Sequence, residues 1–123
     1  IKIGAIADTV SAGVAKRLFA NTQISNYATE GEAQQALLAG EIHALVAANP
    51  LPRFLSIKHP GKVDVPLAKP LVSYKEGFAI NKGQFDFINF LDAWIVARNA
   101  DAWIPSTRSY WLESLDWQEQ VNK

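Results

Sequence analysis

Four polar residues have the types and positions needed to hold a small anion. Asp8, Thr9 and Ser11 follow a β-rich N-terminal stretch, and Asn49 follows a second apolar stretch. Each side chain carries an oxygen that can cap a helix by accepting a hydrogen bond from a backbone N–H. Free N–H groups at such a helix start also attract carboxylate or phosphate. These residues therefore predict either plain helix caps or contacts to an anionic ligand, and both interpretations stay open.

Covalent and metal chemistry find little support in the sequence. The chain has no cysteine, which excludes thiolate nucleophiles and thiolate zinc sites. Its serines lack the G-x-S-x-G context of a nucleophile elbow. His43 and His59 are the only histidines, and a shared metal site there lacks a third ligand at the usual spacing. We therefore expect no catalytic residue, no metal and no cofactor, with both histidines structural or exposed.

The overall length and composition indicate one soluble globular domain, or part of a larger one. They do not indicate a membrane or nucleic-acid protein. The 123 residues are 49% apolar, which is enough for a packed core. Twelve basic and twelve acidic side chains cancel, and no block of like charge occurs. A nucleic-acid partner or an anionic membrane is therefore not expected. The longest uncharged run, from residue 42 to residue 52, is too short to span a bilayer.

Two strand-then-helix units at the start predict how the polar residues are positioned. Residues 1–6 are β-rich, and the following stretch 12–20 places apolar side chains on one helical face. Residues 24–27 predict a short second strand. Successive units of this kind build a parallel sheet with helices on its faces. The fold class expected is therefore α/β, with a parallel-rich sheet and flanking helices.

Residues 29–54 predict a third unit of the same kind. Thr29 and Glu32 have the spacing of a capping box, and Gly40 can take positive φ just past the helix end. The run from residue 42 to residue 48 is apolar without alternation, as in a strand covered on both faces. Asn49 as N-cap and Pro50 as first helical residue then predict a new helix.

The remainder of the chain changes in character after a join near residues 70–77. Turn signals at residues 59–61 precede a predicted strand at 62–67, and GFAIN, residues 77–81, predicts another. An apolar stripe predicts a helix over 84–98, and a further helix is expected from Pro105. All four tryptophans follow residue 90, and at helical spacing beside Leu and Ile we expect them in the core.

Five segments, in this order, carry a resemblance to a known family: KIGAIADTVSAGVAKRL, EAQQALLAGEIHALVAANPLPRFL, KHPGKV, YKEGFAINKG and FINFLDAWIVARNADAWIPSTRSYWLESL. Together they resemble the second half of a type II periplasmic solute-binding protein of the amino-acid-binding kind. The resemblance implies that residues 1–72 form lobe two. Residues 73–123 would then be the returning crossing strand and the C-terminal helices of an incomplete lobe one.

The same resemblance implies a set of ligand and hinge residues. The loop that usually presents Gly and two hydroxyl residues to a ligand carboxylate carries Asp8, Thr9 and Val10 here, with Ser11 able to compensate. Ala48, beside Asn49, stands where the family has an Asp that pairs with an ammonium group. An unpartnered buried ammonium is costly, which favours an anionic or neutral ligand. The hinge residues implied are Val72, Ser73, Tyr74 and Gly77.

The function implied is capture of a small polar or anionic solute in the periplasm for an ABC-type importer, without chemistry. Its partners would be the solute and, in the full-length protein, the importer's membrane subunits. The resemblance implies that the first half of lobe one lies outside this chain, so we expect the fragment to self-associate or to swap its C-terminal piece. Two alternatives remain: an enzyme similar to the cyclohexadienyl dehydratases with Asp8 as general acid, and a ligand-sensing domain of a signalling protein.

Overall fold

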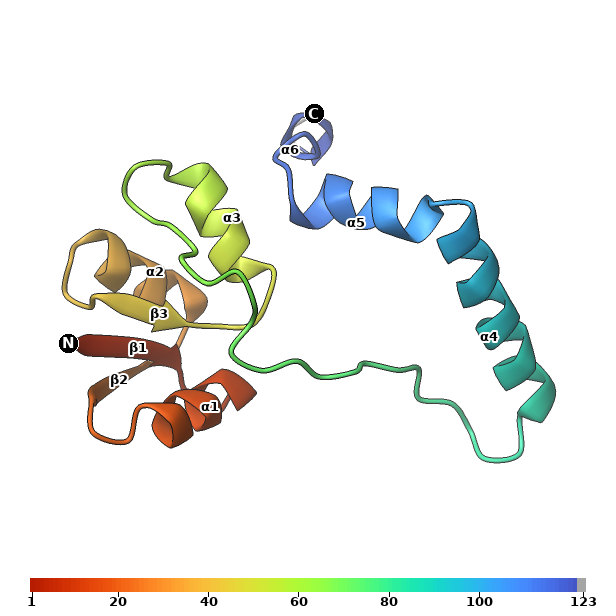
Figure 1. Ribbon diagram of the computed structural model, residues 1–123, viewed down its shortest axis with the longest axis horizontal. Coiled ribbons are helices and arrows are strands. Elements are labelled where there is room, and N and C mark those ends of the chain that lie inside the picture. The colour runs from red at the N-terminus through yellow and green to blue at the C-terminus, as the bar shows by residue number, and fades with distance from the viewer. Residues whose placement is uncertain (122–123) are drawn as a thin grey trace. The chain divides into compact units, whose positions relative to one another are not determined.

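The computed structural model describes residues 1–121 and has a mixed α/β fold with a three-stranded sheet and six helices. The chain divides into two compact units. The first comprises Ile1–Pro70 and contains the sheet, and the second begins at Leu71 and is helical (Figure 1). The assignment of these units to lobes of a binding protein stays a prediction.

The sheet consists of β1 (Lys2–Ile6), β2 (Gln23–Tyr27) and β3 (Ala44–Val46), all parallel and in the order β2-β1-β3 (Figure 1). The predicted parallel sheet is confirmed. Its central strand is buried at Ile3, Gly4 and Ala5, and successive residues of a strand face opposite sides of the sheet. Both faces are therefore covered at β1, but β3, which was predicted to be covered on both faces, is exposed at Ala44 and half-buried at Leu45 and Val46.

β3 is shorter than the stretch 42–48 predicted from its apolar run. The backbone N–H of His43 donates to the carbonyl of Lys2, but the Lys2 N–H donates to Nδ1 of the His43 ring, 2.9 Å away. A side chain thus takes the place of a backbone carbonyl where the strand would otherwise begin. His43 is exposed and structural, as the sequence predicts.

Two capped helices follow β1 and β2. α1 (Val10–Leu18) is capped by Thr9, and α2 (Glu30–Leu38) begins with the complete capping box of Thr29 and Glu32. Gly40 has φ +76° directly after α2, as predicted. Small apolar side chains let both helices approach the sheet closely, and the buried ones are Val14, Ala15, Ala33 and Ala36.

α3 (Leu51–Lys58) begins without the predicted Asn49 cap. Pro50 occupies the N-cap position, and no side chain caps this helix. Asn49 lies one residue too early, because the Leu51 N–H closes a turn onto the carbonyl of Ala48. The predicted turn after the helix is confirmed, with Gly61 at φ +82°. Leu55 anchors α3 as its fully buried residue.

The two strands predicted at residues 62–67 and 77–81 are not formed. From residue 63 to residue 81 the described chain has no helix and no strand. A strand needs a neighbouring ladder to satisfy its backbone groups. Pro66 and Pro70 also remove donors from this segment. Residues 77–81 find no partner strand among the described residues, so the prediction of a β-strand there was wrong.

Three helices complete the second unit: α4 (Phe85–Ala100), α5 (Trp103–Leu112) and α6 (Gln118–Val121). α5 begins at Trp103 and not at Pro105, because proline fits within a first helical turn, where N–H groups lack partners anyway. The predicted burial of the four tryptophans was wrong: three are exposed, and Trp117 is half-buried. Trp94, Trp103 and Trp111 are 37%, 48% and 46% exposed, because the three helices bury no residue completely.

Candidate ligand-binding edge of the sheet

The C-terminal ends of β1 and β3 bring the two predicted binding loops to the same edge of the sheet. Ala5 pairs with Val46 in register. Asp8 lies three residues after Ala5, and Asn49 lies three residues after Val46. The chain moves from β1 to β2 on one side and then crosses to β3 on the other side. The β1/β3 boundary is therefore a topological switch point, where ligands bind in open parallel sheets.

Thr9 holds the first of these loops in place. Its Oγ1 accepts from the N–H of Ala12 at 3.2 Å and donates to the carbonyl of Ile6 at 2.7 Å. The hydroxyl proton is thus used within the loop, and Thr9 acts as a helix cap. The N–H groups of Val10 and Ser11 lie in the first turn of α1, where no intrahelical acceptor exists.

Asp8 adopts the left-handed conformation, with φ 57°. Few residues other than Gly accept this region, and Asp is one of them. This explains how Asp8 can occupy the place where the resemblance has a Gly. Its carboxylate is exposed and forms no hydrogen bond or ion pair with the residues that the structure describes.

Two further polar side chains at this edge are also unpaired within residues 1–121. Ser11 is half-buried and Asn49 is exposed, and neither side chain has a hydrogen-bond partner there. Val10 presents an exposed apolar side chain in the same loop. Ala48 is exposed and brings no charge. The edge thus offers one carboxylate, one hydroxyl, one amide and free backbone N–H groups.

The predicted hinge residues lie in the irregular segment of the second unit. Val72 is half-buried, whereas Ser73, Tyr74 and Gly77 are exposed and belong to no helix or strand. Irregular backbone of this kind can absorb a change in φ and ψ. Their role as a hinge stays a prediction.

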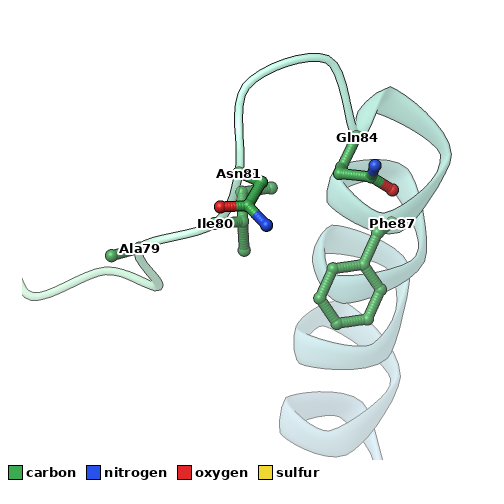
Figure 2. Close-up of a pocket in the computed structure, with 5 residues that line it drawn as sticks. All are labelled: Ala79, Ile80, Asn81, Gln84 and Phe87. Carbon is green, nitrogen blue, oxygen red and sulfur yellow. The ribbon is translucent and has the colours of Figure 1, made fainter.

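A shallow hollow that the sequence did not indicate lies within the second unit. It is lined by Ala79, Ile80, Asn81, Gln84 and Phe87 (Figure 2). The hollow is widely open, and its polar groups are two neutral amides on either side of the turn before α4. It contains none of the predicted binding residues. Such a surface lacks the enclosure that typical ligand pockets have.

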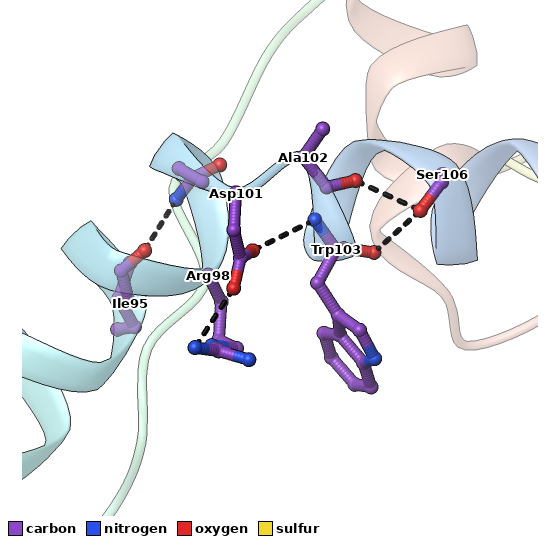
Figure 3. A network of polar contacts seen from close by, with 7 residues as sticks. Ile95, Arg98, Asp101, Ala102, Trp103 and Ser106 are labelled. Carbon is purple, nitrogen blue, oxygen red and sulfur yellow. Dashed lines mark hydrogen bonds and ion pairs between the residues drawn. The ribbon is translucent and has the colours of Figure 1, made fainter.

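A polar cluster at the α4–α5 corner is structural (Figure 3). The Asp101 carboxylate pairs with Arg98 at 2.7 Å and accepts from the Trp103 N–H at 3.0 Å. The Ser106 hydroxyl bonds to the carbonyls of Ala102 and Trp103. Each contact satisfies a backbone group or a charge at a helix end. The contacts of the cluster therefore stabilise the turn between α4 and α5, and its polar groups are already paired with one another.

Comparison with known proteins and a survey of the described residues add three findings. No protein-family model matches the chain, and no curated protein matches it. Within residues 1–121, no group of three or more His, Asp or Glu side chains could hold a metal ion. In the same range, no helix combines the length and apolarity that crossing a membrane requires.

Proposed function

We propose that this chain binds a small polar or anionic solute at the β1/β3 edge, as lobe two of a type II periplasmic solute-binding protein that delivers its solute to an ABC-type importer. One observation carries the proposal. The loop of Asp8–Ser11 and the loop of Ala48–Asn49 follow adjacent parallel strands at a topological switch point. Their side chains are left unpaired by the rest of the described chain, apart from the Thr9 cap.

The groups at this edge favour an anion or a neutral solute over an amino acid. The N–H groups of Val10 and Ser11, at the positive end of the α1 dipole, can donate to a carboxylate or phosphate. Ala48 supplies no carboxylate for an ammonium group, and Asn49 can form a hydrogen bond but carries no charge. Asp8 opposes an anion. Its exposed position lets solvent screen that repulsion.

The solute is tested by titrating the labelled chain with succinate, inorganic phosphate and glutamine, one at a time, while amide chemical shifts are recorded. We expect succinate or phosphate to shift the amides of residues 8–12 and 48–51. Shifts spread evenly over the chain, or confined to the second unit, would contradict the proposal. Glutamine is expected to bind at least about tenfold more weakly, because its ammonium group lacks a partner.

Two matched variants separate an effect on the geometry of the binding loop from a general loss of stability. Thr9→Ala and Thr29→Ala each remove one helix cap, at a cost of about 1 kcal/mol of folding free energy. Only Thr9 lies in the proposed site, so only Thr9→Ala should weaken anion binding. Ala48→Asp is expected to reverse the preference toward glutamine by supplying a counter-charge. Equal affinities in all three variants would refute the assigned residues.

A further inference from the structure

One hydrogen bond at the start of the β1–β3 pairing depends on the protonation state of a side chain. The backbone N–H of Lys2 donates to Nδ1 of His43 at 2.9 Å, and the backbone N–H of His43 donates to the carbonyl of Lys2, also at 2.9 Å. A ring nitrogen accepts a hydrogen bond only when it carries no proton. The first of these bonds therefore requires the neutral imidazole with its proton on Nε2.

This contact matters because the strand pairing that it begins is short. β3 pairs with β1 at only three positions, from Ala44 to Val46, and no residue of β3 is fully buried. Directly before His43, the side chain of Ile42 is 2% exposed and lies close to Gly4 of the central strand. Ile42 thus fixes the position from which the His43 ring reaches β1, and the Lys2–His43 contact adds to a ladder that has few other bonds.

The Lys2 N–H is the only group within residues 1–121 that forms a hydrogen bond or ion pair with the His43 ring. The charged groups nearest to it along the paired segments are the side chains of Lys2 and Glu41, both exposed, and the amino group of Ile1. The elements packed against β3 are β1, α1 and α2. The charged residues in the two helices are Lys16, Arg17, Glu30 and Glu32. None of these charges pairs with the ring, so its own protonation decides whether the contact forms.

We propose that His43 makes the start of the β1–β3 pairing sensitive to pH, because the Lys2–His43 hydrogen bond forms with the neutral ring and is lost when the ring takes up a proton. A protonated Nδ1 would direct its N–H against the N–H of Lys2, and two donors repel. The exposed ring can then turn toward solvent, which leaves the Lys2 N–H to bind water. Histidine is the side chain that ordinarily changes its charge between pH 5 and pH 8.

The direction of the effect follows from proton binding. The contact opposes protonation of His43 in the folded chain, so the unfolded chain binds more protons at this position, and stability falls as the pH drops from 8 to 5. Lys2 and His43 lie at the N-terminal ends of their strands, whereas the loops of Asp8 and Asn49 follow the C-terminal ends. The proposal is therefore independent of the solute proposed to bind at that other edge.

Nuclear magnetic resonance of the ¹⁵N-labelled 123-residue chain tests the hydrogen bond directly. We expect a scalar coupling across the hydrogen bond between the backbone nitrogen of Lys2 and Nδ1 of His43 at pH 8, and its loss at pH 5. The Lys2 amide signal should shift with the same pH midpoint as the ring signals of His43. Absence of the coupling at pH 8, or its persistence at pH 5, overturns the proposal. This measurement uses the unmodified chain, so it decides the matter even where a variant fails to fold.

Urea unfolding at pH 8 and pH 5 measures the effect on stability. Loss of the contact should lower the folding equilibrium constant of the parent chain by about fivefold between these two pH values. His43→Asn places an amide oxygen where Nδ1 lies but does not titrate, so this variant should lack that fivefold decrease. His59→Gln removes the other histidine as the matched control and should retain it. Equal pH dependence of the parent chain and His43→Asn overturns the proposal, as does a dependence that disappears only in His59→Gln.

Discussion

Gly4 shows how one small residue sets the packing of the sheet. A Cβ added there would clash with Cδ1 of Ile42 and lie 3.1 Å from the ring of Tyr27. Ile42 is itself 2% exposed and has little room to move. The central strand therefore depends on glycine here for space, although its φ and ψ are those of an ordinary strand.

We predict that Gly4→Ala destabilises the chain by about 1–3 kcal/mol, as overpacking a core does. Combining it with Ile42→Val, which removes the clashing methyl group, should recover part of that loss. Urea unfolding of the two single variants and the double variant measures the coupling. Additive losses would show that Ile42 is not the group that Gly4 accommodates.

Asp8 combines an unusual backbone conformation with a charged group at the proposed binding edge. Its left-handed backbone and its unpaired carboxylate both follow directly after β1, at the edge where the solute is proposed to bind. Removing the charge with Asp8→Asn keeps a side chain that accepts this conformation. This variant therefore probes electrostatics at the site with little change in the loop.

Among the helices, the corner between α4 and α5 contains the second of the two non-glycine residues with positive φ in residues 1–121. Ala102, at φ 61°, has no side-chain polar group to offset this conformation. The ion pair of Arg98 with Asp101 and the hydrogen bonds of Ser106 hold the corner in shape (Figure 3). The corner is thus stabilised by contacts on both sides of the strained residue Ala102.

We predict that Ala102→Gly stabilises the helical unit by about 0.5–1 kcal/mol, because glycine accepts positive φ without steric cost. Ala93→Gly, in the interior of α4, should instead destabilise it by about 1 kcal/mol. Thermal melting followed by far-UV circular dichroism compares the two. A shift of both variants in the same direction would contradict a left-handed Ala102.

At the scale of the whole chain, the irregular segment between α3 and α4 contains the exposed connection between two units. Its backbone forms no regular hydrogen-bond ladder, and most of its side chains are exposed. Such segments open more readily than helices and strands and are cut first by proteases. The lysines available there are Lys62, Lys75 and Lys82, since Lys69 precedes a proline.

We expect limited trypsin digestion to cut first at these three lysines. Cleavage at Lys16 and Arg17 in α1 should follow later, because that helix packs on the sheet through Val14 and Ala15. Mass spectrometry of early fragments identifies the order, and Lys75→Gln should remove one early cut without slowing the other two. Early cleavage within α1 would show that the first unit is less stable than its packing indicates.

Sequence alone predicted the features that depend on neighbouring residues. The capping box of Thr29 and Glu32, the positive φ of Gly40 and the turn at Gly61 are local, because each needs only a few successive residues. The parallel sheet also followed from the order of elements. The prediction of Asn49 as the N-cap of α3 was wrong, because Pro50 takes that position.

Only the tertiary structure decided which segments found partners. Residues 77–81 have the composition of a strand, but no described strand pairs with them. Trp94 has the spacing of a core residue but is 37% exposed. The β2-β1-β3 order likewise put the loops of Asp8 and Asn49 at one edge, although 40 residues separate them. Pairing and burial depend on distant parts of the chain, which local patterns do not encode.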